Sequence, residues 1–397
     1  MPLRILLVSL HTSPDDDPGT GDVGGMNVAV RATALELGAL GHTVDVATRR
    51  TSPDMASAHP IAPHVVLHHL AAGPPERRVK GDHEGYIDEF ARALDGFGDI
   101  DVIHSHHWFS GMAALDVARR RGIPHVQSFH SIAADPATPL SEGERPESPG
   151  RMRGEERLAR ESDAVIAISA AERDTVVNRL GAPESRVAVV APGVDGELFS
   201  PLANPSNERP GYVVVAARIE PLKGLDLAME ALAALPATGR PDLVVAGGPT
   251  TGHEAYAAEL RTLGDRMGIS VRFVGPQARP KLAALLRGAR MLLVPSHSET
   301  FGLVALEAAA SGIPVVAMRS GGLVEAVEHG VTGLLVDSRD PAAWTDAVGH
   351  LLADDVFAHQ LGKAGRERAL TFTWRKAATE TADVYARLIA AKGGARS

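Results

Sequence analysis

Short apolar runs alternate with amphipathic stretches along the first half of the chain. The runs are continuously apolar and rich in β-branched residues, which is typical of strands buried on both faces of a parallel sheet. A helical pattern over about residues 26–40 separates the first run from the second. The strands predicted in this way are Arg4–Leu10, Thr43–Ala47, Val65–Leu70, Asp101–His104, His125–Phe129, Ala164–Ile168 and Val187–Val190.

The pattern is interrupted at residues 191–210, where Pro, Gly, Asn and Ser concentrate as in a linker. A second alternation follows it, and the tail from about Pro341 is helical only. The strands predicted here are Tyr212–Ala217, Leu243–Ala246, Val271–Val274, Met291–Val294, Val315–Ala317 and Leu334–Val336. The whole pattern predicts an α/β protein of two Rossmann-like, doubly wound domains that face each other across a cleft.

We expect the N-terminal domain to span residues 1–195 and the C-terminal domain to span residues 196–374. A last helix, at about residues 375–397, is expected to pack back on the first domain. Ligands of open α/β sheets bind at the carboxyl ends of the strands, so the cleft is the predicted site.

Composition and charge narrow the function classes. Of the 397 residues, 44% are hydrophobic and 22% are charged, the balance of a folded enzyme. The absence of Cys excludes disulfides and a thiol nucleophile. The net charge of −9 is unsuited to nucleic acid or an anionic membrane. No apolar run approaches the ~18 residues of a membrane helix, and the apolar start leads to an Asp-rich loop, so we expect a cytoplasmic protein.

A glycine-rich loop follows the first predicted strand. Four glycines lie within Gly19–Gly25, where they let the backbone approach a ligand and where the next helix offers N–H groups to an anion. Gly19–Gly24 also fits the dinucleotide pattern G-x-G-x-x-G. The insert His11–Pro18 separates it from the strand, however, and the acidic candidate Asp45 lies within a strand. A flexible turn is the structural alternative.

Two cations follow the first strand of the second half. Arg218 and Lys223 lie five residues apart beside a predicted helix start, an arrangement that suits a pyrophosphate. They could stabilise a departing phosphate without a metal. A solvated surface pair is the alternative.

Two carboxylates lie in the segment Ser296–Glu307, which follows a strand and leads into a helix. We expect Glu299 in the loop and Glu307 two turns into the helix, where both could accept hydrogen bonds from sugar and ribose hydroxyls. Gly302 would let the helix N-terminus meet a phosphate. Ser296 and Glu299 also fit a capping box, which is a purely structural alternative.

Histidines close two neighbouring strands of the first half, at His104–His107 and at Ser128–Ser131. They predict a polar wall of the cleft. A metal site is disfavoured, because no carboxylate stands at a zinc-like spacing. Lys80, Arg151 and Arg153 are candidate anion-binding residues on the same wall.

Taken together, the stretches GDVGGMN, R-x4-K and E-x7-E with an internal FGL resemble glycosyltransferase family 4. The resemblance covers nearly the whole chain. It implies the GT-B fold, retention of configuration, a nucleotide-diphospho-sugar donor and no catalytic metal or other cofactor. The segment HTSP…PGTGDVGGMNV is similar to the members that transfer N-acetylglucosamine from UDP-GlcNAc to 1L-myo-inositol 1-phosphate, the first step of mycothiol synthesis. Members of this group often form homodimers.

The resemblance implies a donor site with residues from both halves. Its predicted members are Gly24 and Gly25 at the diphosphate, Arg218 and Lys223 as balancing cations, Glu299 with the amides of Phe301, Gly302 and Leu303 at the sugar, and Glu307 at the ribose. His130 would contact the reacting face of the sugar. The predicted catalytic residues are therefore His130, Arg218, Lys223 and Glu299.

For a phosphorylated cyclitol acceptor, the resemblance implies Asn27, Lys80, His107, Ser131 and Arg151. His107 stands where the related pattern has Tyr, and Ser131 stands where it has Thr. Serine keeps the hydroxyl, whereas His shortens the reach of the side chain. A different small acceptor or donor within the family therefore stays open.

Two hypotheses of another class also stay open. An NADP-dependent oxidoreductase would use Gly19–Gly24 and the pair Arg49–Arg50. A non-catalytic sensor of sugar nucleotides would bind UDP without turnover.

Overall fold

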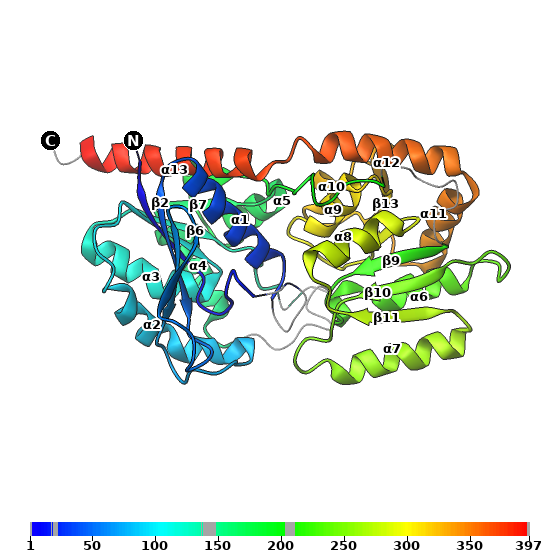
Figure 1. Ribbon diagram of the computed structural model, residues 1–397, viewed down its shortest axis with the longest axis horizontal. Coiled ribbons are helices and arrows are strands. Elements are labelled where there is room, and N and C mark those ends of the chain that lie inside the picture. The colour runs from blue at the N-terminus through cyan, green and yellow to red at the C-terminus, as the bar shows by residue number, and fades with distance from the viewer. Residues whose placement is uncertain are drawn as a thin grey trace.

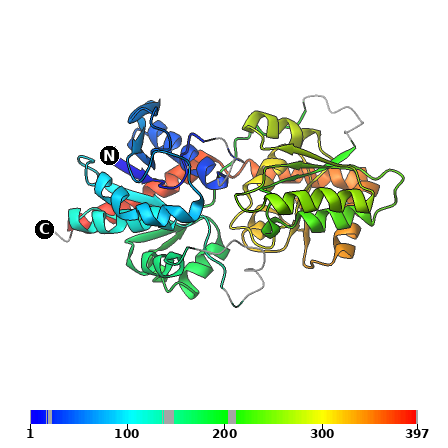
Figure 2. The ribbon, with the colours of Figure 1, turned by 90° about the horizontal axis from the view of Figure 1, so that it is seen from below.

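The computed structural model describes residues 2–16, 18, 23–135, 137, 148–202 and 211–394. They form two α/β lobes that lie side by side (Figure 1), and the view from below shows the same division (Figure 2). One lobe is built on an eight-stranded sheet and the other on a six-stranded sheet. The predicted architecture of two doubly wound domains is confirmed. The part of the glycine loop at residues 19–22 lies outside the described residues.

The first sheet has the strand order β3-β4-β2-β1-β5-β6-β7-β8. Its strands are β1 (Arg4–Val8), β2 (Thr43–Arg49), β3 (Ala58–Ala62), β4 (Val65–Leu70), β5 (Val102–His106), β6 (His125–Ser128), β7 (Ala164–Ala167) and β8 (Val187–Val189). The ladders are parallel except β3–β4, which is antiparallel. The apolar pattern did not predict β3, which contains Pro60 and forms the edge of the sheet, where Pro is tolerated.

Helices cover both faces of this sheet. They are α1 (Gly25–Ala39), α2 (Ile87–Leu94), α3 (Trp108–Arg121), α4 (Arg151–Glu161) and α5 (Ala170–Asn178), with short turns η1 (Lys80–Tyr86) and η3 (Glu184–Arg186). Successive residues of β1 enter different cores because strand side chains alternate between faces. Ile5 and Leu7 pack in the core formed with α1, whereas Leu6 and Val8 pack in the core formed with α2 and α3.

The second sheet has the order β11-β10-β9-β12-β13-β14, with parallel ladders. Its strands are β9 (Tyr212–Ala216), β10 (Asp242–Ala246), β11 (Val271–Gly275), β12 (Leu292–Val294), β13 (Val315–Met318) and β14 (Gly333–Val336). Its helices are α6 (Leu225–Ala233), α7 (Glu254–Met267), α8 (Arg279–Gly288), α9 (Leu303–Ala310), α10 (Leu323–Ala326), α11 (Pro341–Ala353) and α12 (Asp355–Ala369), with the turn η4 (Pro221–Lys223). The strand order reverses at β9, and such switch points hold ligands.

The chain crosses between the lobes twice, and the two crossings touch. The N–H of Val194 donates to the carbonyl of Phe372 (2.9 Å), and a Cβ at Gly193 would lie 2.2 Å from the nitrogen of Trp374. The last helix, α13 (Trp374–Gly394), then runs along the first lobe against α1 and β7 (Figure 1). We keep residues 195 and 374 as the proposed domain boundaries.

The predicted linker differs from a solvated loop over its described part. Val194 and Phe199 are buried in the core of the second lobe, the latter completely. Composition does not predict the burial of these two residues, because Pro and Gly indicate irregular backbone whether or not the apolar residues between them are buried. Residues 203–210 lie outside the described residues.

Candidate functional site

A cleft of about 380 Å³ is lined by both lobes. The predicted residues that line it are Gly24, Gly25, Asn27, Lys80, His107, His130, Ser131, Arg218, Lys223, Glu299, Phe301, Gly302, Leu303 and Glu307. Residues distant in sequence meet here because parallel strands place their carboxyl ends, and the loops that follow, at one edge. Predicted donor and acceptor residues therefore share one cavity.

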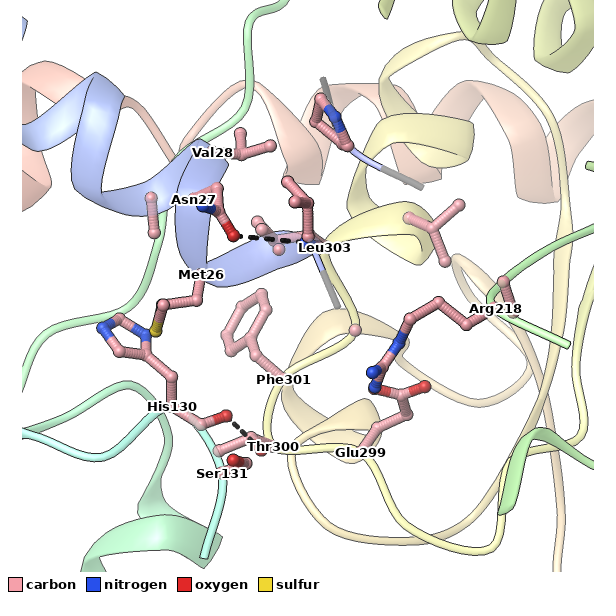
Figure 3. Close-up of a pocket in the computed structure, with 18 of the residues that line it drawn as sticks. Met26, Asn27, Val28, His130, Ser131, Arg218, Glu299, Thr300, Phe301 and Leu303 are labelled. Atoms are coloured by element: carbon pink, nitrogen blue, oxygen red, sulfur yellow. Dashed lines mark hydrogen bonds between the residues drawn. The ribbon is translucent and has the colours of Figure 1, made fainter. Parts of the chain in front are cut away.

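The N-termini of α1 and α9 meet at this cleft, and Figure 3 shows Asn27 on the side of Leu303 and Met26 on the side of His130. A Cβ at Gly25 would lie 3.1 Å from Leu303 Cδ1, so glycine permits the close approach. In the first turns as described, neither helix has an acidic side chain. Unpaired N–H groups at two helix N-termini, without a competing carboxylate, favour a bound anion.

The cations of the second lobe are held by carboxylates. Lys223 Nζ lies 2.8 Å from Glu299 Oε1, and Arg218 Nη2 lies 3.0 Å from Glu220 Oε1. Ser296 Oγ donates to Glu299 Oε1 (2.9 Å). An ammonium has three donors and a guanidinium five, so each cation keeps donors for a phosphate. The capping-box reading is wrong, because α9 begins at Leu303 and Ser296 bonds to the Glu299 side chain instead.

A glycine pair after β13 supports the loop that carries Glu299. The N–H of Gly322 donates to the carbonyl of Glu299 (2.9 Å). A Cβ at Gly321 would lie 2.1 Å from that same carbonyl oxygen, and one at Gly322 would lie 2.1 Å from the carbonyl oxygen of Thr300. Sequence reasoning missed this support, although two adjacent glycines after a strand were a visible signal.

Glu307 is the fifth residue of α9, nearer the helix start than predicted, and it is buried. It forms an ion pair with Arg279, whose guanidinium also lies over the ring of Phe199 (4.6 Å). Burial raises the pKa of Glu307, while Arg279 acts in the opposite direction. Arg279, the first residue of α8, lines the cleft and was not predicted.

The histidine wall has an unusual backbone. His107 (φ 71°, ψ 157°) and His130 (φ 60°) have positive φ angles, which are uncommon for residues other than glycine and are often found at functional sites. Burial lowers the pKa of His130 to about 4 and holds that of His107 well below its usual range. Both imidazoles are therefore neutral near pH 7. His11, which was not predicted, lines the cleft with its ring centroid 4.4 Å from that of His107.

Two predicted acceptor residues are placed differently from expectation. Arg151 is buried behind the cleft wall rather than lining it. Its Nε lies 2.7 Å from Glu155 Oε1, and its Nη2 donates to Ser131 Oγ (3.2 Å). Asn27 is also buried: its Nδ2 donates to the carbonyl of Ser13 (2.7 Å) and its Oδ1 accepts from a backbone N–H. The spacing of residues in the sequence does not predict the direction of either side chain.

Comparison with known proteins assigns the chain to a family. Residues 23–198 match the model described as Glycosyltransferase Family 4, and residues 200–368 match that of Glycosyl transferases group 1. A D-inositol 3-phosphate glycosyltransferase of Frankia alni is 42% identical over 92% of this chain and 95% of its own. One from a Nocardioides species is 38% identical over 97% and 90%. The chain belongs to glycosyltransferase family 4.

Solved structures place this family-4 glycosyltransferase in the GT-B fold. Sucrose-phosphate synthase of Thermosynechococcus elongatus has a TM-score of 0.89 and 29% identity, covering 98% of this chain and 100% of its own. The HepE protein of Anabaena, in complex with UDP-glucose, has a TM-score of 0.75 at 20% identity, covering 97% and 100%. The enzyme is a transferase. Among its described residues, no helix is both long and apolar enough to cross a membrane.

The residues of the oxidoreductase hypothesis have structural roles in this glycosyltransferase. Arg49 is buried and donates to the carbonyls of Pro74 (2.8 Å) and Glu76 (2.6 Å). Asp45 Oδ1 lies 2.7 Å from His68 Nε2 within the sheet. Neither side chain is placed to bind a dinucleotide, and the family assignment overturns this hypothesis.

Among the described residues, no cluster of three His, Asp or Glu side chains could hold a metal ion.

Proposed function

We propose that this glycosyltransferase transfers N-acetylglucosamine from UDP-GlcNAc to 1L-myo-inositol 1-phosphate, the compound also called D-inositol 3-phosphate. The observation that carries the proposal is a cleft with basic residues on opposite walls. Arg218 and Lys223 line it from the second lobe, and Lys80 lines it from the first. A reaction between a diphosphate donor and a phosphorylated acceptor needs a cationic subsite for each.

On the donor side, the N-termini of α1 and α9 would receive the diphosphate. Arg218 and Lys223 would balance its charge, and the buried carboxylate of Glu307 would accept hydrogen bonds from the ribose hydroxyls. Glu299 and the amides at the start of α9 would hold the sugar. The ion pairs described above support these roles, because they fix the charged side chains before the substrate arrives.

On the acceptor side, Lys80 and Ser131 would contact the phosphate, while Arg151 would act through Ser131 from behind. The relatives named D-inositol 3-phosphate glycosyltransferase support an inositol phosphate as acceptor. His107, with both ring nitrogens buried and unpartnered within the described structure, would meet the acceptor as a neutral imidazole.

The proposed chemistry is a front-face displacement with retention and without a catalytic metal. The acceptor hydroxyl attacks C1 of the sugar on the side from which UDP departs. The new C1–O bond forms as the bond between C1 and the phosphate oxygen breaks, and the hydroxyl proton passes to that departing oxygen. Arg218 and Lys223 stabilise the charge that develops on UDP. His130 would contact the sugar at the reacting face.

The test is an incubation with UDP-GlcNAc and inositol 1-phosphate, followed for UDP release and for the anomeric configuration of the product by NMR. We expect UDP release that depends on the acceptor, an α-linked product and unchanged activity in EDTA. Free inositol is the control for the phosphate subsite. Hexose phosphates are the comparison acceptors, because the chain is similar to sucrose-phosphate synthase. UDP release with a hexose phosphate but not with inositol phosphate would contradict the acceptor assignment.

Binding of UDP without turnover of any acceptor would instead support the sensor hypothesis. We also propose that the enzyme is cytoplasmic and forms a homodimer. Light scattering of the purified protein would test the oligomeric state.

A further inference from the structure

A row of buried imidazoles connects the C-terminal helix to the cleft. His104 and His106 lie two residues apart on β5, with ring centroids 4.3 Å apart. His104 Nδ1 lies 2.6 Å from the hydroxyl of Tyr385 on α13. At the other end of the row, His106 Nδ1 lies 2.8 Å from Nε2 of His130, which lines the cleft. Of these histidines, the proposed reaction uses only His130.

The hydrogen bonds fix the tautomer of His104. Ser128 Oγ donates its single proton to the carbonyl of Ile166 (2.8 Å), so at the 3.0 Å contact it must accept from His104 Nε2. Burial holds the pKa of His104 well below its usual range, so the ring is neutral and Nδ1 carries no proton. Nδ1 therefore accepts from Tyr385, and both nitrogens of His104 are occupied.

The same reasoning fixes the tautomer of His106. Both rings of the His106–His130 pair are neutral because burial lowers their pKa values, so one nitrogen donates and the other accepts. Nε2 of His106 is buried without a partner in the described part of the chain, and His104 has no nitrogen left for it. Buried backbone N–H groups are left without a partner more rarely than carbonyl oxygens, and we infer the same preference for these ring nitrogens. The proton of His106 therefore lies on Nδ1 and is donated to His130.

We propose that His106 is a positioning residue that keeps His130 in the tautomer with its proton on Nδ1. His130 Nδ1 has no hydrogen-bond partner among the described residues. It thus offers an N–H donor to a substrate oxygen in the cleft rather than a lone pair. The role in catalysis rests on the proposed function, whereas the tautomer itself does not. The backbone of His130 is held independently, since Thr300 Oγ1 donates to its carbonyl (2.9 Å, Figure 3).

The first experiment reads the tautomer directly, without substrate. Imidazole ¹⁵N shifts are recorded on histidine-labelled enzyme, and the His130 signals are assigned by their loss in His130→Gln. We expect His130 of the wild type to be protonated on Nδ1 and unprotonated on Nε2. We expect the same in His106→Asn, whose amide N–H replaces Nδ1, and a mixture of tautomers in His106→Leu. A wild-type His130 protonated on Nε2 would overturn the proposal.

The second experiment measures transfer by the same variants. His106→Leu should lose about tenfold in kcat/KM, the size of one neutral hydrogen bond, and His106→Asn should recover most of it. His125→Leu is the matched control. His125 is equally buried on the neighbouring strand, but its nitrogens contact Ser105 and Ser162. Equal losses in all three variants would show a packing effect and contradict the role of His106. If the acceptor proves different, the ¹⁵N result still decides the tautomer.

Discussion

At the scale of single residues, the cleft is a set of charges arranged in pairs before any substrate binds. Lys223 is held by Glu299, and Arg279 is held by Glu307. Each pair is partly or largely buried, so solvent screens it less than a surface pair. Such preorganised charges need little rearrangement when negative charge develops on a leaving group. The carboxylates thus set the positions of the cations as well as offering hydrogen-bond acceptors.

Replacing Lys223 should therefore affect turnover more than folding. We expect Lys223→Ala to lower kcat by about 10²–10³, the range for loss of one preorganised electrostatic donor. Steady-state assays of UDP release measure this, with thermal unfolding as the check on stability. Lys281→Ala, at an exposed position of α8, is the control and should behave like the wild type. Near-normal turnover of Lys223→Ala would exclude the assigned role.

A second residue-level prediction concerns pH and Glu172 of α5. This carboxylate accepts from the N–H of Ile168 (2.6 Å), and burial raises its pKa from 4.5 to about 7. Between these values the folded state binds more protons than the unfolded state, so the free energy of unfolding falls as the pH rises. The fall is about 3 kcal/mol at 1.36 kcal/mol per pKa unit.

Urea unfolding of the wild type and of Glu172→Gln from pH 4.5 to 8 tests this. The variant cannot titrate at this position, so its free energy of unfolding should lack the fall with rising pH that Glu172 causes. Parallel pH profiles for the two proteins would contradict the assignment of the slope to Glu172.

At the scale of elements, the apolar pattern predicted most of the strands, but it could not show how helices begin. The predicted helix at about 26–40 is α1, and the order of the strands follows from their alternation with helices. The edge strand β3 was not predicted, because Pro60 interrupts the apolar pattern of its sequence. The start of α9 was expected at Gly302, which is its N-cap residue, whereas the tertiary contacts do not use the alternative capping motif of Ser296 and Glu299. Local motifs identify possible bonds, and packing selects among them.

The N-terminus of α9 depends on one glycine. Gly302 has φ +90°, and a Cβ there would lie 2.5 Å from Leu323 Cδ2. We expect Gly302→Ala to distort the helix start, to weaken UDP binding by about tenfold or more and to lower stability by about 1–3 kcal/mol. Calorimetric titration with UDP and thermal unfolding measure the two effects.

Gly349→Ala in α11 is the control, because its Cβ would make an ordinary contact 3.5 Å from Leu235. Replacing glycine in a helix interior should stabilise the protein slightly and leave UDP affinity unchanged. Equal UDP affinity in the two alanine variants would contradict the role of the α9 terminus.

At the scale of the whole molecule, side-chain hydrogen bonds join the lobes across the cleft. Thr300 Oγ1 donates to the carbonyl of His130 (2.9 Å), and Glu325 Oε1 accepts from the N–H of Ala170 at the start of α5 (2.7 Å). Because residues of both lobes line the cleft, the complete site exists only while the lobes stay in this arrangement. The bond of Thr300 joins the loop that carries Glu299 in the second lobe to His130 in the first lobe (Figure 3).

Loss of that bond should weaken binding of both substrates. We expect Thr300→Val to raise both KM values about three- to tenfold, the equivalent of one hydrogen bond. Thr300→Ser keeps the hydroxyl and should stay near the wild type. Kinetics measure the effect, and small-angle scattering would detect a more open shape. An unchanged KM in Thr300→Val would show that this contact does not support the closed arrangement.

The sequence by itself determined the two-sheet architecture and the approximate composition of the cleft. Both follow from local information, because apolar periodicity defines the strands and parallel topology brings their carboxyl ends to one edge. Arg218, Lys223 and Glu299 could therefore be assigned to the cleft from their positions after strands. Only the tertiary structure decided which side chains contact one another. It buried Arg151 behind Ser131, paired Arg279 with Glu307 and joined His106 to His130. These contacts link residues 20 to 28 positions apart through side-chain rotamers, which are fixed by packing and have no periodic signature in the chain.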